Sequence, residues 1–479
     1  MTLDRDNFFI AGQWQAPSSS RRFTIYNAST GEIAATVPEG VEADVDAAVA
    51  AARHAFDNSP WPKLPAAERA SIMLRFMEAL IARGSAIAEA VSLQNGMPIT
   101  LANMLEAQFP AGVLQYYASL ADQLTTSESR PSQMGQETLV ERAPVGVVAA
   151  IVPWNFPVTL AFSKIAPAML AGCTLVIKPS PGTVLDSYLV AEAAIEAGVP
   201  AGVINIVAAD RDVGAYLVSH PDVDKVAFTG STVAGRAIAA QCGQMLRPVT
   251  LELGGKSAAL LLDDVDLANF LPAIPLVSML NNGQACYNGT RILVPDARYG
   301  EIVDAIAATV SSFSVGDARD PATHVGPMAS AAHRDRVESY IAKGRAEARL
   351  VAGGGRPKGH NSGWFVEPTV FADVGNDAVI AQEEIFGPVL SVIRYADEDD
   401  AVRIANSSQF GLGGSVWSSD QGHAIDVARR VESGTVGVNG YMPSLGSPFG
   451  GIKASGMGSE FGPETLAGYQ RTKSIYVMG

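Results

Sequence analysis

The chain has 479 residues, more than a single hydrophobic core normally serves, so two or three domains are expected. Hydrophobic residues make up 48% and charged residues 17% of the sequence, a balance typical of a soluble α/β protein and unlike a disordered or fibrous chain. The formal net charge of −15 argues against nucleic acid or an anionic membrane as a partner, because an acidic surface repels phosphate groups.

Several classes of protein are disfavoured by what the sequence lacks. No apolar run reaches the roughly 18 residues of a membrane helix, and the first residues lack the pattern of a secretory signal. The three cysteines are widely spaced, which argues against a disulfide framework. The six histidines show no paired spacing typical of metal ligands. We therefore expect a cytoplasmic protein without membrane insertion and without a metal site.

The predicted elements begin with short strands and two long helices. Runs at residues 8–10, 22–26 and 32–37 are β-prone and separated by glycines, which is typical of antiparallel strands. Apolar residues then recur at helical spacing over 42–56 and 65–83.

From residue 145 the pattern changes to strands that alternate with helices. Such alternation predicts a parallel sheet covered on both faces, with a nucleotide-binding site at the turns that follow the strands. The expected strands are 147–152, 174–177, 203–207 and 225–228, and the expected helices are 160–170, 184–196 and 213–218.

After residue 257 a second alternating series begins. It comprises a strand at 258–262, a helix at 267–280, a strand at 291–294 and a helix at 299–313, and continues to 436–439. Residues 128–142 and 471–477 fit neither series. We interpret these two segments as peripheral strands that pair across a subunit boundary, because an exposed strand edge promotes aggregation.

The fold class predicted from these series is α/β with three parts. A Rossmann-like nucleotide-binding domain comprises residues 1–122 and 143–253, and a second α/β catalytic domain comprises 254–447. A small β oligomerisation arm comprises 123–142 and 466–479.

Cys286 is a candidate nucleophile. A lone cysteine is usually a buried and inert residue. Here Gly283 and Gly289 bracket the cysteine, and three polar residues precede it at the end of an apolar helix, where packing alone favours Leu or Ala. This context favours a thiol that forms a covalent intermediate. Cys173 and Cys242 lie in apolar surroundings, and we predict that both are inert.

Glu252 and Asn155 are candidates for the base and the oxyanion donor. Glu252 ends a β-prone run just before two glycines, a position where sites form in α/β folds, although a surface carboxylate is the alternative. Asn155 stands between Pro153 and Pro157, which fix the backbone on either side of its amide. A rigid amide donor is worth about 3–4 kcal/mol to a developing oxyanion, and an ordinary proline-rich turn is the alternative.

Three further segments favour a nucleotide. Gly230 and Ser231 end a strand and open a helix, so free backbone N–H groups can meet a phosphate, although the G-x-G-x-x-G pattern is absent. Lys178 closes the neighbouring strand with a cation suited to ribose or phosphate. Glu384 and Phe386 offer a carboxylate and a ring, with a solvated acidic loop as the alternative.

Six segments of the sequence, taken together, resemble the aldehyde dehydrogenase superfamily over nearly the whole chain. The motifs follow the family's order and spacing, and so many ordered motifs are very specific. They are Pro153-Trp154-Asn155-Phe156-Pro157, Phe228-Thr229-Gly230-Ser231, Leu251-Glu252-Leu253-Gly254-Gly255-Lys256, Gly283-Gln284-x-Cys286 with Arg291, Glu384-Ile385-Phe386-Gly387-Pro388 and Pro448-Phe449-Gly450-Gly451-x-Lys453.

The resemblance implies a role for each candidate residue. Cys286 attacks the aldehyde, Asn155 holds the oxyanion, and Glu252 activates the water that hydrolyses the thioester. NAD is the expected cofactor. NADP stays open, because Pro181 replaces a glutamate that many NAD-using members carry. The implied cofactor contacts are Ile151, Trp154, Lys178, Ser180, Gly230, Ser231, Leu253, Glu384 and Phe386.

The same resemblance implies a substrate tunnel without charged residues. We therefore predict a neutral, apolar aldehyde of medium-chain or terpenoid type, because a charged substrate would be buried without a partner. Ser163 replaces a bulky aromatic residue of many relatives, and we expect it to widen the tunnel. The implied lining is Phe156, Leu160, Ser163, Tyr287, Tyr441, Pro443, Leu445 and Phe449.

Other functions stay open at this point. Betaine aldehyde is the alternative substrate, since aromatic residues can cage a quaternary ammonium. A CoA-acylating relative usually lacks a carboxylate at the position of Glu252, and a thiol hydrolase needs a histidine base near Cys286. A catalytically silent relative has no need of Glu252 and Asn155. The resemblance also implies a homodimer or a homotetramer.

Overall fold

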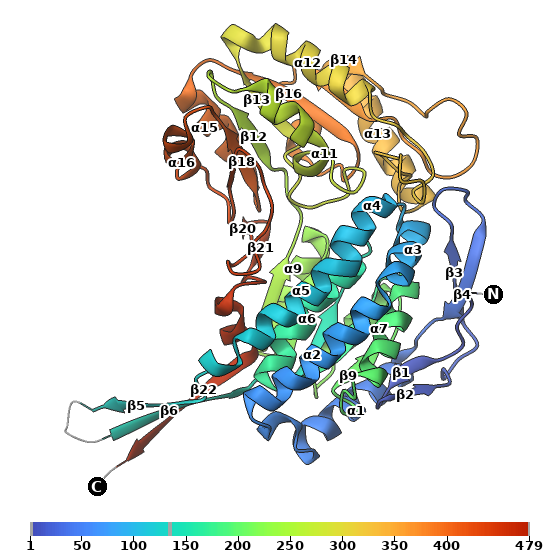
Figure 1. The fold of residues 1–479 in the computed structure, drawn as a ribbon, viewed down its shortest axis with the longest axis vertical. Helices are drawn as coiled ribbons and strands as arrows, with labels where there is room; N and C mark the ends of the chain where they lie inside the picture. The colour runs from blue at the N-terminus through green and yellow to red at the C-terminus, as the bar shows by residue number, and fades with distance from the viewer. Residues whose placement is uncertain (1–2, 133–136, 478–479) are drawn as a thin grey trace.

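The computed structural model describes residues 3–132 and 137–477. Two α/β bodies lie one above the other, and a β-ribbon arm projects from the lower body and carries the C-terminus (Figure 1). The lower body contains the first half of the chain, and the upper body is built mainly from residues 258–439. The predicted α/β class is confirmed. Within the described residues, no helix combines the length and apolarity needed to cross a membrane.

The sheet of the lower body has five parallel strands at its centre and antiparallel strands at its edges. Its order is β2-β1-β9-β8-β7-β10-β11-β21. Buried apolar runs form the central strands, as expected for a sheet covered on both faces. The strands are β1 (Phe8–Ile10), β2 (Gln13–Gln15), β7 (Val147–Ile151), β8 (Thr174–Lys178), β9 (Ile204–Ile206), β10 (Lys225–Thr229), β11 (Val249–Glu252) and β21 (Gly456–Met457).

Alternate side chains of this sheet enter two separate cores. Val148 and Ala150 of β7 join one apolar cluster, and Val147 and Ala149 join the other, because successive strand residues point to opposite faces. The helices on the first face are α2 (Ala66–Ala82), α3 (Gly84–Asn95), α5 (Phe109–Ser119), α6 (Pro157–Ala171) and α7 (Leu185–Glu196), and those on the second face are α1 (Glu42–Asn58), α8 (Arg211–Ser219) and α9 (Thr232–Gln244).

The upper body repeats this plan with a sheet of order β14-β15-β16-β13-β12-β18-β19, parallel except at β14. Its strands are β12 (Ala258–Leu261), β13 (Arg291–Pro295), β14 (Arg349–Ala352), β15 (Thr369–Ala372), β16 (Val389–Tyr395), β18 (Gly414–Trp417) and β19 (Gly437–Val438). One face packs on α13 (Ala331–Glu347), α15 (Glu398–Asn406) and α16 (Gln421–Ala428), and the other on α12 (Tyr299–Ser311) and the short helices before it.

The helix predicted over 267–280 is not continuous. The structure has α10 (Leu267–Phe270), a 3₁₀ turn and α11 (Ile274–Val277) in its place. Pro272 and Pro275 lie in this segment, and proline lacks the N–H that an unbroken helix requires. The prediction of one long helix is therefore wrong.

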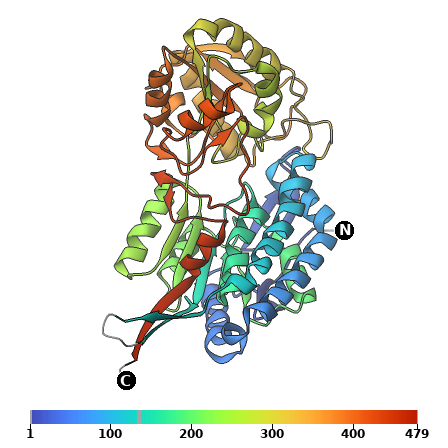
Figure 2. The same ribbon diagram turned by 60° about the vertical axis from the view of Figure 1, so that its left-hand side comes forward.

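The arm is a three-stranded antiparallel sheet in the order β22-β6-β5 (Figure 2). Its strands are β5 (Ser127–Pro131), β6 (Glu137–Pro144) and β22 (Gln470–Val477). β22 comes from the end of the chain and pairs along the whole length of β6. Residues 133–136 and 478–479 of the predicted arm lie outside the described part of the chain. A separate hairpin of β3 (Arg22–Tyr26) and β4 (Ile33–Pro38) lies near the N-terminus.

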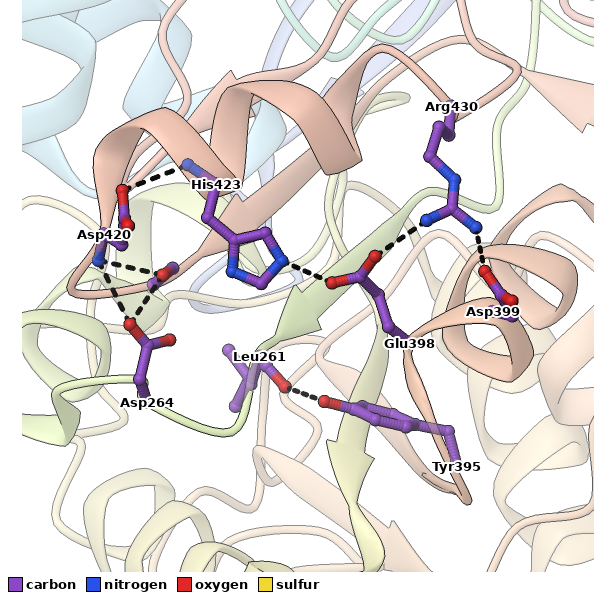
Figure 3. A network of polar contacts seen from close by, with 9 residues as sticks. Leu261, Asp264, Tyr395, Glu398, Asp399, Asp420, His423 and Arg430 are labelled. Carbon is purple, nitrogen blue, oxygen red and sulfur yellow. Dashed lines mark hydrogen bonds and ion pairs between the residues drawn. The ribbon is translucent and has the colours of Figure 1, made fainter.

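A polar network connects the outer elements of the upper body (Figure 3). Glu398 on α15 accepts a hydrogen bond from Arg430 at 2.7 Å and contacts His423 of α16. The Asp264 carboxylate accepts the backbone N–H of Asp420 at 3.1 Å. These charged side chains are partly or largely solvent-exposed, so each pair contributes at most about 1 kcal/mol and the network mainly orients the helices.

Candidate active site

The predicted site residues meet at the carboxyl edge of the lower sheet. β7 has β8 on one side and β10 on the other, so the chain leaves the ends of β7 and β10 in opposite directions. A crevice forms at such a point in an open α/β sheet. A cavity of about 480 Å³ lies there, between the two bodies. Its walls include Trp154, Asn155, Gly230, Ser231, Leu253, Cys286, Glu384 and Phe386.

Cys286 follows a left-handed turn that the sequence only hinted at. Asn281, Asn282 and Gly283 have φ values of 50°, 59° and 79°. Asparagine tolerates this region better than other residues with a side chain, which explains the polar residues before the cysteine. The Asn282 amide donates to the carbonyl of Gly96 at 2.8 Å, so the turn is attached to the end of α3 in the other body.

Hydrogen bonds with three other residues hold Asn155 in place. Its side-chain amide donates to the carbonyl of Gln284 at 2.9 Å. Its own carbonyl accepts hydrogen bonds from Asn95 and Asn281, both at 2.9 Å. Because an amide NH₂ carries two hydrogens, one donor stays available for a substrate oxygen.

Glu252 is buried, and its surroundings change the pKa of its carboxyl group. Its side chain is 2% exposed, and neither carboxylate oxygen has a hydrogen-bond partner within the described chain. Burial raises the pKa of Glu252 well above its usual range, and the nearby Glu460 carboxylate raises it further, while Lys164 acts in the opposite direction. The alternative interpretation of Glu252, a carboxylate exposed at the surface, is therefore wrong.

An ion pair beside Glu252 was missed by the sequence analysis. Lys164 of α6 donates to Glu460 at 2.5 Å and to the Thr229 hydroxyl at 2.7 Å, and its side chain is fully buried. The partners lie 296 positions apart, so no local pattern connects them. Only a lysine within an apolar helix hinted at this pair.

Ser163 does not occupy the position that we expected. The residue is fully buried, and the single hydrogen of its hydroxyl is within donating distance of Glu460 at 2.7 Å and of the Leu160 carbonyl at 2.9 Å. The structure therefore places Ser163 beside the ion pair, with no exposed surface that widens a tunnel.

The Cys286 thiol is partly buried, and its surroundings oppose ionisation. Burial raises the pKa of Cys286, and the carboxylates of Glu384 and Glu252 raise it further. The chain on its own therefore holds a protonated thiol, and forming the thiolate requires a positive charge close to the sulfur or a base that takes its proton.

The cavity has the groups that a dinucleotide requires. α9 begins in its wall, with Ser231 as the N-terminal cap, so free N–H groups and a positive helix end face the space. Glu384 accepts the Gly255 N–H at 2.9 Å, and burial raises the pKa of this carboxyl to about 7. A Cβ added at Gly254 would lie 2.5 Å from the Glu384 carboxylate, so the glycine is needed for this approach.

Not every predicted cofactor residue lines this cavity. Its walls do not include Ile151, Lys178 or Ser180. Lys178 ends β8, and its amine donates to the carbonyl of Ala209 at 2.8 Å. Burial lowers the pKa of Lys178 to about 8, so this amine is still mostly protonated at pH 7.

Comparison with known proteins decides among the open families. The model of the family described as "Aldehyde dehydrogenase family" matches residues 14–475. The chain belongs to the aldehyde dehydrogenase family. Members of this family oxidise aldehydes with NAD or NADP, so the chain is an NAD(P)-dependent aldehyde dehydrogenase and the expectation from the sequence is confirmed.

Similar proteins cover the whole length of this aldehyde dehydrogenase. A geranial dehydrogenase of Castellaniella defragrans is 60% identical over 479 residues, 100% of each chain. An aldehyde dehydrogenase of Mycobacterium tuberculosis complexed with NAD+ has a TM-score of 0.97 at 46% identity, covering 100% of this chain and 99% of that one. A mutant aldehyde dehydrogenase of Pseudomonas syringae, complexed with NAD+ and octanal, has a TM-score of 0.95 at 39% identity, with 98% and 96% covered.

Residues of α13 also line the cavity between the two bodies, which the sequence analysis missed. His333 donates to the carbonyl of Phe386 at 2.6 Å, and burial lowers the pKa of this imidazole to about 4, so it is neutral. Phe386 has a φ of 64°, which is unusual for an aromatic residue. Its ring lies edge-on to Trp154 at 5.3 Å. His333 thus supports the strained Phe386 rather than acting as a base toward Cys286.

A second cavity of about 540 Å³ lies among residues 435–449. Its walls carry no charged residue, and they include Tyr441, Pro443 and Phe449 of the predicted tunnel. The Tyr441 hydroxyl is 2.5 Å from the Thr435 hydroxyl, so its polar group is already paired. Phe156, Leu160, Leu445 and Tyr287 belong to one apolar cluster with Cys286 and Phe449.

Proposed function

We propose that this aldehyde dehydrogenase oxidises a neutral, apolar aldehyde of medium-chain or terpenoid type, such as geranial, to the carboxylic acid with NAD. The cavity lined by Tyr441, Pro443 and Phe449, whose walls are uncharged, carries the proposal. The relative named geranial dehydrogenase and the neighbour that holds octanal support the same class. A carboxylate-bearing semialdehyde would leave its charge buried without a partner, which costs several kcal/mol.

In the first half of the reaction the Cys286 thiol loses its proton to solvent water, and the sulfur then bonds to the aldehyde carbon. The carbonyl oxygen gains the electron pair of the broken π bond, and the free N–H of the Asn155 amide and the Cys286 backbone N–H stabilise it. When bound, NAD supplies the hydride acceptor and a positively charged ring. The carbonyl re-forms as the hydride leaves, and Cys286 then carries a thioester.

In the second half Glu252 takes a proton from water. The water oxygen bonds to the thioester carbon, the carbon–sulfur bond breaks, and the electron pair returns to the Cys286 sulfur. The raised pKa of Glu252 makes its carboxylate a stronger base than an exposed one. The Lys164–Glu460 ion pair lies in the same buried region as Glu252, and its lysine favours the charged form of the Glu252 carboxylate.

The proposed cofactor contacts divide between the two bodies. Gly230, Ser231 and Leu253 of the lower body face the cavity together with Glu384 and Phe386 of the upper body. Lys178, Ser180 and Ile151 would hold the adenosine half of NAD outside this cavity.

The proposed domain limits follow the same division into two bodies. The nucleotide-binding domain comprises residues 1–122 and 143–253, the catalytic domain comprises 254–447, and the arm comprises 123–142 and 466–479.

An aldehyde panel tests the proposal. Geranial, octanal, acetaldehyde, succinic semialdehyde and betaine aldehyde would be compared by kcat/KM with NAD and with NADP, and Cys286→Ala serves as the blank. We expect geranial and octanal to give the highest values with NAD. A preference for succinic semialdehyde or acetaldehyde would contradict the proposal. A preference for betaine aldehyde would favour an aromatic cage for its quaternary ammonium, formed by Trp154, Tyr441 and Phe449.

We also propose that the chain forms a homodimer or homotetramer in the cytoplasm through its arm. The arm strands project away from the lower body, and Tyr476 of β22 is 73% exposed, as expected of a surface that a second copy covers. Light scattering on the full chain and on a chain shortened before β22 would test this. An unchanged mass of the shortened chain would contradict the role of the arm.

A further inference from the structure

The backbone at Asn155 is attached to the end of α3 by one buried side chain. Asn95, the last residue of α3, is fully buried, and its amide donates to the carbonyls of Trp154 at 3.1 Å and of Asn155 at 2.9 Å. Its side-chain oxygen accepts the backbone N–H of Met97 at 2.8 Å. Because both donors and the oxygen are engaged, the Asn95 amide has one orientation and holds two consecutive carbonyls.

The chain then enters α6, whose start lacks an ordinary cap. Phe156 stands at the N-cap position and has no side-chain oxygen to accept the first free N–H groups of the helix. The Glu106 carboxyl accepts them instead, from Val158 at 2.7 Å and from Thr159 at 3.4 Å. Glu106 lies 52 positions before Val158, so a distant side chain takes the place of the missing cap.

A π-helical segment carries Glu106 to this position. Residues Asn103–Gln108 form the segment, between α4 (Ile99–Ala102) and α5. Such segments are rare in helices and are frequent at functional sites. Glu106 is fully buried, and burial raises its pKa to about 8, so the carboxyl is mostly protonated at pH 7. Its Oε1 atom has no partner within the described residues, so the bonds to α6 are the main contacts of this carboxyl group.

We propose that Asn95 and Glu106 are positioning residues that hold the Asn155 amide at the reaction centre, one from each side along the chain. This inference rests on the proposed role of Asn155 as oxyanion donor and names the groups that fix it. The Asn155 amide also bonds to the carbonyl of Gln284, so a shift of its backbone would move the free N–H away from the substrate oxygen or break this bond. The walls of the cavity between the two bodies include neither Asn95 nor Glu106, so both act through Asn155.

A double-mutant cycle tests whether Asn95 acts through Asn155. NADH formation in a single turnover would be measured with the aldehyde that has the highest kcat/KM in the panel. We expect Asn95→Ala to lower the rate constant at least about tenfold, since a misplaced catalytic group costs up to about 100-fold. In the Asn155→Ala background the same change should lower the rate constant less than about twofold, because no amide is left to position.

Glu106 offers a conservative variant beside a disruptive one. Glutamine resembles a protonated carboxyl group in shape and keeps an oxygen that accepts the Val158 N–H. We therefore expect Glu106→Gln to keep the rate constant within about twofold of the wild type. Glu106→Leu removes the acceptor and should lower the rate constant at least about tenfold, and only where the Asn155 amide is present.

Asn205→Ala is the matched control for a loss of stability. Asn205 of β9 is also fully buried, and its amide donates to the carbonyls of Leu175 at 3.1 Å and Gly202 at 2.8 Å and accepts the Ala11 N–H at 2.9 Å. The control therefore loses the same set of hydrogen bonds as Asn95→Ala, without a bond to the oxyanion donor. Urea unfolding should show similar losses of stability in both variants, whereas only the control should keep the wild-type rate constant.

The substrate proposal and this inference fail in different ways. The order of the wild-type kcat/KM values in the aldehyde panel decides the substrate class. Unchanged rate constants in Asn95→Ala and Glu106→Leu would overturn the positioning role, and so would an equal loss with and without the Asn155 amide. A loss of the same size in Asn205→Ala would overturn it as well. If Asn95→Ala does not fold, the two Glu106 variants decide.

Discussion

Asn155 donates its side-chain amide to the carbonyl of Gln284, two positions before Cys286, at 2.9 Å. Asn155 follows β7 of the lower body, whereas Gln284 belongs to the loop before β13 of the upper body. The proposed oxyanion donor and the proposed nucleophile are therefore joined by a direct hydrogen bond across the two bodies. If the two bodies move relative to each other and the Asn155–Gln284 hydrogen bond is kept, Asn155 stays in place relative to the Cys286 loop.

Removal of the Asn155 amide should slow attack on the aldehyde. We expect Asn155→Ala to lower kcat by about 100-fold to 1,000-fold, the usual effect of losing one oxyanion donor. NAD affinity should change little. Stopped-flow absorbance of NADH in a single turnover measures the step, and Asn103→Ala, on an exposed amide, is the control. Equal single-turnover rates for the Asn155 variant and wild type would contradict the role.

Replacement of Glu252 should separate the two halves of the reaction. We expect Glu252→Gln to form about one NADH per active site and then to turn over at least about 100-fold more slowly, because general-base assistance to water is lost. Mass spectrometry should detect the acyl group on Cys286. Glu301→Gln changes an exposed carboxylate and serves as the control. A variant with normal steady-state turnover would show that another group activates water.

The pH dependence of turnover should reveal the neighbouring charge. Burial raises the pKa of Glu252 and the Glu460 carboxylate raises it further, so hydrolysis of the thioester is lost as the pH falls through that raised pKa. Glu460→Gln removes the negative neighbour and leaves Lys164 positive. We therefore expect the acidic limb of the kcat profile to move to lower pH. If the acidic limb moves to higher pH or does not move, Glu460 does not raise the pKa of Glu252.

Glu384 should make cofactor binding sensitive to pH near neutrality. Burial raises the pKa of this carboxyl to about 7. Below that pH the group becomes neutral and accepts a ribose hydroxyl less well, so the KM for NAD should rise as the pH falls below about 7. Glu384→Gln should raise this KM and remove its pH dependence. If Glu384→Gln keeps the wild-type pH dependence of the KM for NAD, a group other than Glu384 causes that dependence.

Gly255 should tolerate no side chain. An added Cβ would lie 2.4 Å from the Cys286 carbonyl oxygen, a contact that forces the backbone apart. We expect Gly255→Ala to destabilise the fold by about 1–3 kcal/mol and to lower activity. Gly243 near the end of α9 has nothing within 4 Å of such a Cβ, so Gly243→Ala should be neutral or stabilising by up to about 1 kcal/mol. Thermal denaturation compares the two.

The sequence determined the layered α/β plan and the chemistry of the main candidates. Buried apolar runs such as Val147–Ile151 define strands locally, because a strand covered on both faces needs apolar residues at every position. Cys286, Glu252 and Asn155 stood out because each combines a reactive or donor group with neighbouring glycines or prolines. The helix expected over 267–280 failed because two prolines outweigh apolar periodicity.

Tertiary structure alone decided how distant residues act on these candidates. The Lys164–Glu460 pair, the support of Phe386 by His333 and the hydrogen bond of Asn95 with Asn155 join segments far apart in the chain. Ser163 illustrates the same limit: its small size suggested open space, but its hydroxyl pairs with Glu460. Local sequence sets which groups are present, whereas burial and charge at each group depend on neighbours that only the folded chain brings together.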